Sequence, residues 1–258
     1  MLMTTTGDIF QFIDGFAPFR TAMGFDNPGL LVGDEGMNVT KSILSLDITP
    51  EVVREASELG AQLIVSHHPV IFHPLKRLDT ASVPYLLASR SIAAICAHTN
   101  LDMAPGGVND CLAGRLRLKN VRMLCENSDS GLPEALCGET DREYSPREFA
   151  QFVKNALGCE GLCYVDGGRR VNSAGLCGGG GADYLYDAAQ AGCQAFVTGE
   201  CKHNILLDAE SLGVTLVAAG HFETEDPVIP ALMQKLAERF QDVSFVRSRA
   251  AHGPVHYL

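Results

Sequence analysis

The 258-residue sequence predicts an α/β protein built from two similar α/β subdomains that arose by internal duplication. Two observations predict this fold class. Helical and strand-like stretches alternate along the chain, which is the pattern of βαβ units. In addition, Glu55–Ser66 aligns with Asp187–Thr198 without a gap, at a shift of 132 residues. Four positions of this alignment are identical, namely Ala56/Ala188, Gly60/Gly192, Gln62/Gln194 and Val65/Val197.

The first elements follow from apolar spacing and from capping residues. Apolar residues recur at helical spacing or in short buried runs, and turn residues separate these stretches. Thr49 stands at the N-cap position, where its hydroxyl can accept a backbone N–H. The expected elements are a helix over Thr5–Phe16, a strand over Ser42–Asp47, a helix over Pro50–Leu59, a buried strand over Ala61–Val65 and a packing helix over Val228–Phe240.

A second pair of similar segments, which we call the second echo, extends the repeat. Ala93–Asp102 aligns with Leu216–Glu225, and in both an apolar strand ends in a histidine that is followed four residues later by a carboxylate. A polar stretch that carries proline and glycine, Glu126–Pro146, separates the two halves. We therefore expect a first subdomain over residues 1–125 and a second over 126–258, with an approximate boundary and a C-terminal segment that could pack on the first.

The chain is acidic, with 20 Lys+Arg against 31 Asp+Glu and a formal charge of −11. This balance argues against nucleic acid as a partner, because binding to a phosphate backbone needs several Lys or Arg contacts. No run approaches the roughly 20 apolar residues of a membrane helix, and no secretory signal is visible, so we expect a cytoplasmic protein with no membrane partner. The nine irregularly spaced cysteines are expected to be reduced.

Histidines and carboxylates follow the strands at several points. They occur at His67-His68, His98 to Asp102, Gly199-Glu200 and His221 to Glu225. In open α/β sheets, ligands bind at the carboxyl ends of the strands. Because adjacent strand residues point to opposite sides, we expect His67 and His68 to serve two neighbouring metals rather than one. The alternative is a pair of ordinary surface histidines at a strand end.

The residue types indicate the kind of metal. Imidazole and carboxylate ligands without cysteine suit Zn, Mn, Fe, Co or Ni, and they do not identify which. Two divalent ions paired with the carboxylates Asp102 and Glu225 would keep a net positive charge. Such a site would hold hydroxide and attract the oxygens of an anionic small molecule. We therefore expect two divalent metal ions per chain and a small anionic substrate.

Six motifs, in this order along the chain, resemble the Nif-three-like dinuclear metal centre family, whose members are often named GTP cyclohydrolase I type 2 homologues. The motifs are DNPGLLVGD (Asp26 to Asp34), LDIT (Leu46 to Thr49), IVSHHPVIF (Ile64 to Phe72), AHTNLD with GGVND (Ala97 to Asp110), VTGE (Val197 to Glu200) and GHFETE (Gly220 to Glu225). The resemblance runs from about residue 5 to 240. It implies a three-layer α/β/α fold, a two-metal site between the subdomains and a ring-shaped homohexamer.

Residue by residue, the resemblance places the metal ligands on His67, His68, Asp102, His221 and Glu225. His98 matches the histidine of the AHTNLD motif, where we expect either a ligand or a supporting residue. Many relatives carry a Tyr-His pair near His203-Asn204, and this departure leaves that loop without an assigned role.

Other motifs allow more than one interpretation. Glu200 aligns with His68 in the repeat, and we expect it to act as a catalytic base or as a supporting acid near the metals; a solvated strand-end glutamate is the alternative. The glycine-rich Gly175–Asp183 could cradle a phosphate or could simply form a tight turn. Asp47 is expected to cap a helix rather than to line the cleft. Asp26–Gly29 is a turn that the resemblance brings towards the cleft.

Together these features favour a metal-hydroxide-dependent hydrolase that acts on a nucleotide or another phosphorylated small molecule. Opening of the GTP ring is one form of that reaction, although nothing in the sequence selects guanine. The alternative is a non-catalytic, metal-carrying ring scaffold or chaperone that binds protein partners.

Overall fold

The chain forms two compact units, each with its own sheet. The computed structural model describes residues 3–258. Unit 1 comprises the residues up to Pro105 together with Ile229–His252. Unit 2 comprises Gly106–Val228 together with Gly253–Leu258.

This division lies earlier in the chain than the boundary expected at residues 125/126. Strand β5 (Lys119–Glu126) pairs antiparallel with β6 (Pro133–Tyr144), so it belongs to the sheet of unit 2. The polar stretch around Ser128 is therefore a turn between two strands of one sheet, because turn residues mark hairpins as readily as domain boundaries. The C-terminal segment 229–252 returns to unit 1.

Unit 1 contains a five-stranded, mainly parallel sheet. Its strand order is β1-β4-β3-β2-β11, and only β1 runs antiparallel to its neighbour. The strands are β1 (Gly29–Val32), β2 (Lys41–Ser45), β3 (Leu63–Ser66), β4 (Ala93–Cys96) and β11 (Ser244–Arg247). The helices are α1 (Thr6–Phe16), α2 (Pro50–Glu58), α3 (Val83–Ser89), α4 (Thr99–Met103) and α10 (Val228–Arg239), with a 3-10 turn η1 (Phe19–Thr21).

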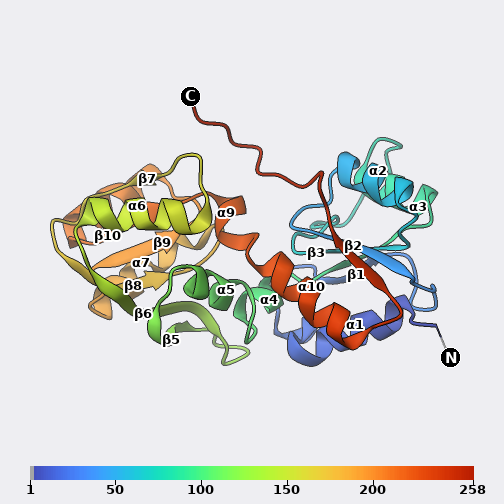
Figure 1. Cartoon of the computed structure of the whole chain (residues 1–258), viewed down its shortest axis with the longest axis horizontal. Coiled ribbons are helices and arrows are strands. Elements are labelled where there is room, and N and C mark those ends of the chain that lie inside the picture. Colours follow the sequence, from blue (N-terminus) through green and yellow to red (C-terminus); the bar gives the residue numbers. More distant parts are fainter. Residues whose placement is uncertain (1–2) are drawn as a thin grey trace. The chain divides into compact units, whose positions relative to one another are not determined.

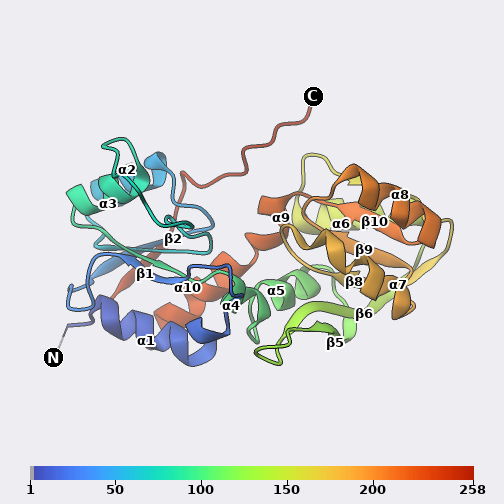
Figure 2. The same cartoon turned by 180° about the vertical axis from the view of Figure 1, so that it is seen from behind.

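Helices cover both faces of this sheet. Figures 1 and 2 show α2 and α3 on one face and α1 and α10 on the other. On the α2 face, Ile43 and Ile64 pack in one buried cluster with Val52 and Leu87. Burial of four such side chains stabilises the layer by roughly 1.5 to 3 kcal/mol each. Unit 1 is thus a three-layer α/β/α sandwich.

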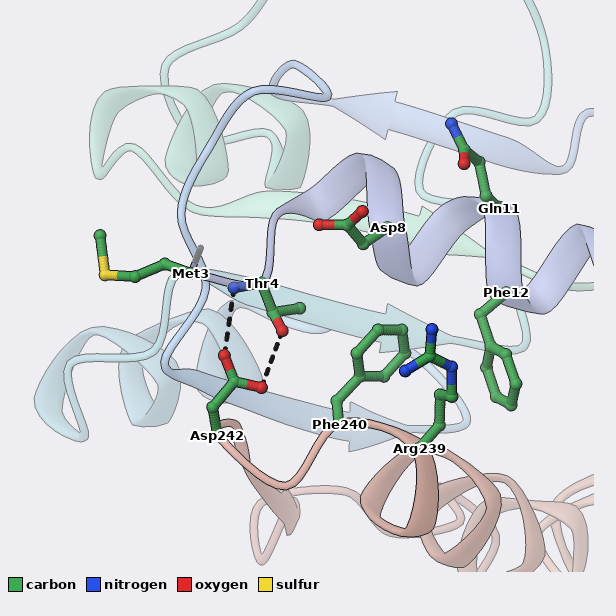
Figure 3. Close-up of a pocket in the computed structure, with 8 residues that line it drawn as sticks. All are labelled: Met3, Thr4, Asp8, Gln11, Phe12, Arg239, Phe240 and Asp242. Carbon is green, nitrogen blue, oxygen red and sulfur yellow. Dashed lines mark hydrogen bonds between the residues drawn. The ribbon is translucent and has the colours of Figure 1, made fainter. Parts of the chain in front are cut away.

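The chain before α1 is tied to the segment after α10. Thr4 donates from its backbone N–H and from its hydroxyl to the carboxylate of Asp242, at 3.1 and 2.8 Å. These residues line a cavity of about 350 Å³ that also includes Phe12 and Arg239 (Figure 3).

Unit 2 contains a six-stranded mixed sheet in the order β5-β6-β8-β9-β10-β7. Only β8, β9 and β10 are parallel to one another. The remaining strands are β7 (Cys163–Tyr164), β8 (Val171–Leu176), β9 (Ala195–Thr198) and β10 (Thr215–Ala218). The helices are α5 (Val108–Arg115), α6 (Pro146–Leu157), α7 (Leu185–Gln190), α8 (His203–Leu212) and α9 (His221–Glu225), with a 3-10 turn η2 (Gly181–Tyr184).

The side chains of β9 and β10 alternate between two buried clusters. Val197 and Val217 pack with Phe149 of α6 on one face, whereas Phe196 and Leu216 pack with residues of α7 and α8 on the other. This alternation follows from the period of two in a strand. Unit 2 is therefore also a three-layer α/β/α sandwich, and the predicted fold class is confirmed.

The repeat found in the sequence is a repeat of backbone pairing. Ser42 pairs with Leu63 in unit 1, and the residues 132 positions later, Ala174 and Ala195, pair in unit 2. The glutamine that the two repeats share, Gln62 and Gln194, links neighbouring segments by hydrogen bonds in each unit. The side-chain oxygen of Gln62 accepts the amides of Thr40 and Lys41 while its amide donates to Gly60, and Gln194 makes the same bonds with Asn172, Ser173 and Gly192.

The second echo has a different register from the one aligned in the sequence. Ser66 pairs with Cys96 in unit 1 and Thr198 pairs with Ala218 in unit 2, which is a shift of 122 for the later strand. Aligning His98 with His221 requires a shift of 123, so these histidines do not occupy equivalent backbone positions. The backbone equivalent of His98 is Gly220.

The expected elements of the first half are confirmed to within two residues. Thr49 is the N-cap of α2 and accepts the amide of Val52, and Thr5 caps α1 in a reciprocal bond with Asp8. All nine cysteines are thiols rather than disulfides. Among residues 3–258, no helix has the length and apolar character that a membrane crossing requires.

We predict that Glu55→Gln lowers the free energy of unfolding by roughly 1 kcal/mol at pH 7. Burial alone would raise the pKa of Glu55, but hydrogen bonds from Ser248, Arg249 and Ala250 outweigh it and hold this pKa below its usual value. A carboxyl with a lowered folded-state pKa stabilises the protein above its unfolded-state pKa, and this stabilisation disappears as the pH falls through the folded-state value.

Denaturant unfolding at several pH values measures the effect. The difference between Glu55→Gln and the unsubstituted protein should shrink as the pH falls below about 4.5, the ordinary value for a glutamate. Glu58→Gln, at an exposed position of the same helix, is the control and should change stability little. A difference that grows on acidification would contradict the prediction.

Candidate metal centre

Three histidines of unit 1 gather where β3 and β4 end. His67 and His68 directly follow β3, and His98 comes two residues after β4. The ring centroids lie 4.9 Å apart for His67 and His68, 5.1 Å for His67 and His98, and 5.5 Å for His68 and His98. One nitrogen from each ring lies within 4.8 Å of the others, so this group could hold a metal ion. They meet because parallel neighbouring strands end at the same edge.

The expectation that His67 and His68 point to opposite sides is wrong. Strand β3 ends at Ser66, and the amides of both histidines donate to the same carbonyl oxygen, that of Leu46, at 3.2 and 2.9 Å. The backbone therefore bends, and the alternation of an extended strand no longer applies. Both rings consequently lie in one cluster.

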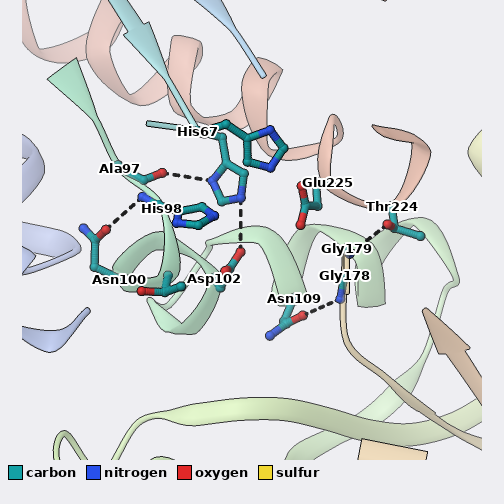
Figure 4. Close-up of polar contacts among 12 residues, drawn as sticks. His67, Ala97, His98, Asn100, Asp102, Asn109, Gly178, Gly179, Thr224 and Glu225 are labelled. Carbon is teal, nitrogen blue, oxygen red and sulfur yellow. Dashed lines mark hydrogen bonds and ion pairs between the residues drawn. The ribbon is translucent and has the colours of Figure 1, made fainter. Parts of the chain in front are cut away.

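His67 is fixed by a hydrogen bond at Nδ1. Its ring is fully buried, and Nδ1 donates to the carbonyl oxygen of Ala97 at 2.9 Å (Figure 4). A carbonyl oxygen can only accept, so Nδ1 carries a proton, and in the neutral form of the ring the lone pair is on Nε2. Metal-binding histidines typically show this arrangement, because the second nitrogen is held by an oxygen.

His68 is held in the same way by a carboxylate. Its Nδ1 lies 2.7 Å from Oδ1 of Asp47. The expectation that Asp47 caps a helix is wrong, because α2 begins at Pro50 and Thr49 occupies the N-cap. Asp47 is too far upstream to reach the first free amides of α2, and it orients His68 instead.

His98 is held by the turn that begins at Asp26. Its Nδ1 lies 2.7 Å from Oδ1 of Asp26, and the second carboxylate oxygen accepts the amide and the hydroxyl of Thr99 at 3.0 and 2.6 Å. Burial alone would raise the pKa of Asp26, but the hydrogen bonds from His98 and Thr99 outweigh it and lower this pKa to about 2. Asp26 is therefore a carboxylate at neutral pH, and the turn contacts the histidine cluster.

Helix α4 places Asp102 beside His67. Its Oδ1 lies 3.4 Å from Nε2 of His67, the nitrogen that faces away from Ala97 (Figure 4). Two ligand atoms of one zinc-like ion, each about 2.0 to 2.2 Å from it, lie roughly 2.8 to 3.6 Å apart at octahedral or tetrahedral angles. The spacing of this nitrogen and this oxygen thus fits a pair of ligands.

Unit 2 carries a second pair on the one-turn helix α9. His221 and Glu225 are four residues apart, so their side chains lie on one face of the helix. Nε2 of His221 lies 3.1 Å from Oε2 of Glu225, whose side chain is only 6% exposed. This spacing also fits two ligands of one ion. A buried carboxylate beside an imidazole nitrogen is the donor chemistry that divalent transition metals prefer.

Glu200 orients His221. Its Oε1 lies 3.2 Å from Nδ1 of His221, and its side chain is 67% exposed. The position at the end of β9 agrees with the sequence alignment of Glu200 with His68, since both follow equivalent strands. The contact is to the histidine ring, so the structure favours a supporting role over that of an isolated base.

The glycine-rich loop packs against this pair. The amides of Gly178 and Gly179 donate to Asn109 Oδ1 and Thr224 Oγ1, both at 3.1 Å (Figure 4). A Cβ at Gly179, whose φ is +56°, would lie 2.0 Å from a carboxylate oxygen of Glu225. Two amides that a phosphate cradle would need are therefore already engaged, and the tight-turn interpretation holds.

The groups that hold the histidines leave little trace in the sequence. Asp47 precedes a helix and resembles a capping residue, and the Ala97 carbonyl oxygen has no side-chain signal at all. His98 and Asp26 are 72 positions apart in the sequence, so no local pattern indicates the hydrogen bond between them.

Comparisons with known proteins place these residues in a family. A model of the family described as Duf34/NIF3 (NGG1p interacting factor 3) matches residues 4–254. A Clostridium perfringens protein named "GTP cyclohydrolase 1 type 2 homolog" is 33% identical over 263 residues, which cover 97% of this chain and 98% of the relative. A Clostridium acetobutylicum protein of the same name is 30% identical over 237 residues, covering 89% of this chain and 88% of the relative.

Solved structures agree with the sequence comparisons. The crystal structure of Staphylococcus aureus hypothetical protein SA1388 matches with a TM-score of 0.92 and 29% identity, covering all of both chains. Reduced HcgD from Methanocaldococcus jannaschii matches with a TM-score of 0.81 and 25% identity, covering 94% of this chain and 97% of that one.

We predict that Gly179→Ala lowers the free energy of unfolding by roughly 1 to 3 kcal/mol, because its Cβ would displace Glu225 and its φ disfavours a side chain. Gly180→Ala is the matched control, since a Cβ there meets nothing within 4 Å and its φ of −84° is one that other residues adopt readily. Its stability should stay within about 0.5 kcal/mol of the unsubstituted protein. Urea unfolding of both variants tests this, and equal stabilities would show that the loop does not press on Glu225.

Proposed function

This chain belongs to the Duf34/NIF3 family, and on that premise we propose that it is a metal-dependent hydrolase that uses two divalent ions. The relatives named "GTP cyclohydrolase 1 type 2 homolog" suggest a nucleotide or another phosphorylated small molecule as the substrate.

The shared orientation of four histidines carries the proposal. His67, His68, His98 and His221 each have Nδ1 against an oxygen atom, at 2.7 to 3.2 Å. In each case the oxygen belongs to a residue at least 21 positions away in the sequence, whereas the Nδ1 of the exposed His252 contacts its near neighbour Ala250. Rings held in this way direct Nε2 towards a ligand, and such outer partners raise metal affinity.

We assign the ligands to the residues that the sequence motifs single out. Unit 1 would supply His67, His68 and Asp102, and unit 2 would supply His221 and Glu225. The spacings of 3.4 Å for His67 and Asp102 and 3.1 Å for His221 and Glu225 support one ion for each pair. The proposal requires that the two clusters meet in the working protein, and His98 would support the first of them.

Bound divalent ions would supply a water molecule of lowered pKa and would polarise a substrate oxygen. The protein groups have separate tasks. Asp47 and Glu200 hold the rings of His68 and His221, and the buried His67 keeps bulk water from one side of its cluster. The exposed carboxylate of Glu200 can also take up a proton at the edge of the site.

We predict that protein purified without chelator or a nickel column carries about two equivalents of divalent metal per chain. His68→Ala and Glu225→Ala should each lose about one equivalent, because each removes a ligand. His252→Ala is the control, since His252 is an exposed histidine whose Nδ1 faces its neighbour Ala250. Elemental mass spectrometry gives the ratio. Unchanged metal content in both ligand variants would refute the assignment.

Hydrolysis itself needs a separate measurement. A panel of nucleotides and phosphoesters, with added Mn, Zn or Fe and with a metal-stripped control, should yield product only when metal is present. Metal binding without any turnover would favour the non-catalytic scaffold instead.

We also propose the homohexamer that the family resemblance implies. Six chains of 27.7 kDa would give a particle of about 166 kDa. Light scattering coupled to size-exclusion chromatography measures this mass directly, and a mass that stays near one chain at micromolar concentration would exclude the ring.

A further inference from the structure

We propose that a cavity in unit 2 binds a planar heterocyclic ring that presents N–H donors, as guanine does. The cavity has a volume of about 430 Å³ and lies against His221. The inference deepens the proposed function, because it names the part of the substrate that would sit beside the metals. Its test below does not depend on metal binding.

The cavity is built from five segments of unit 2. Residues at the ends of β9 and β10 form its floor, and the loop before β7 and the first turn of α8 add the apolar side chains Leu162 and Leu206. Gly253, Pro254, Val255 and Tyr257 of the C-terminal segment also line the cavity. A Cβ at Gly161 would lie 2.4 Å from the ring of Tyr257, so only glycine lets this aromatic side chain pack there.

Aromatic side chains suit the cavity to a flat ligand. Phe222 and Tyr257 both line it, and both are partly exposed. Aromatic rings stack on the flat faces of nucleobases, and this stacking does not depend on which base is bound. The volume lies within the range of about 300 to 1,000 Å³ that is usual for small-molecule sites.

The charged groups determine which ring fits. Glu200 and Glu223 line the cavity, and none of the described residues that line it is Lys or Arg. One oxygen of Glu223 lies against Gly220, whose φ of +100° and lack of a side chain permit that approach. A carboxylate only accepts hydrogen bonds, so it favours a ring with N–H donors and disfavours an anion. Guanine offers adjacent N–H groups, whereas adenine offers a ring nitrogen acceptor in their place.

This charge pattern also divides the substrate into two parts. A phosphorylated group would be repelled by Glu200 and Glu223, so it would be placed at the metals, whose positive charge attracts it. His221 is shared, because it lines the cavity and lies 3.1 Å from Glu225. The ring would therefore lie within reach of the proposed metal pair.

A tryptophan reporter tests the proposal, because the chain contains no tryptophan. Phe222→Trp places one in the cavity. Phe12→Trp is the matched control, since Phe12 is equally half-buried and lines the cavity of unit 1 shown in Figure 3. Both full-length variants are titrated with guanosine, adenosine and inorganic phosphate, as purified and after metal removal.

Guanosine should quench the fluorescence of Phe222→Trp saturably, with and without metal, and should leave Phe12→Trp unchanged. Adenosine should bind at least about tenfold more weakly. Adding Glu223→Gln should weaken guanosine binding by about tenfold and reduce the preference over adenosine. Equal affinity for the two nucleosides, no saturable quenching by guanosine, or displacement of guanosine by phosphate from metal-free protein would each overturn the proposal.

Calorimetric titration of the unsubstituted protein with guanosine keeps the test valid if Phe222→Trp does not fold. Leu206→Trp, which fills the cavity from α8, should abolish the binding heat. Guanosine binding by a protein that holds no metal would support the cavity and refute the metal proposal. Two bound metals without guanosine binding would support the metal proposal and refute the proposed ring-binding cavity.

Discussion

The hydrogen bonds at the Nδ1 atoms are the interactions on which the rest of the candidate site depends. An imidazole ring can present either nitrogen, and a metal site needs one of them held in place. Here the Ala97 carbonyl oxygen and the carboxylates of Asp26, Asp47 and Glu200 hold the rings. These acceptors come from four separate loops. The orientation of each ring is therefore set only after the strands that carry those loops have paired.

The parallel ladders explain why those loops lie together. In unit 1, β2, β3 and β4 are neighbours, and Asp47, His67 and His98 all lie just beyond their carboxyl ends. In unit 2, β9 and β10 place Glu200 and His221 in the same way. Glycine at 199 and 220 lets the backbone turn beside these side chains, since a Cβ at either position would lie within 3 Å of neighbouring atoms. The duplicated unit thus supplies the same kind of edge twice, although it carries different functional side chains each time.

The charge distribution is consistent with a cation as part of the working site. Glu200, Glu223 and Glu225 all lie around His221, in a chain whose formal charge is already −11. Carboxylates that gather without a counter-charge repel one another, and divalent ions would offset this repulsion. The same ions would attract an anionic group while the acidic cavity beside them rejects it. A substrate with a phosphorylated end and an uncharged, N–H-bearing ring satisfies both conditions.

The sequence by itself determined the α/β class, the repeated unit and the strand ends at which functional side chains occur. These are local properties: apolar period, capping residues and the shared glutamine each act over fewer than about 25 residues. The tertiary structure decided how the side chains are used. In the structure Asp47 contacts His68 and does not cap a helix. The rings of His67 and His68 lie on one side. The strand register of the second repeat matches His98 with Gly220 rather than with His221. The tertiary structure also assigned residues 229–252 to unit 1, although the residues on either side of them in the sequence belong to unit 2. Such outcomes depend on strand register and on bends just beyond the strands. A displacement of one residue there changes which groups meet, and no local sequence pattern indicates which register is adopted.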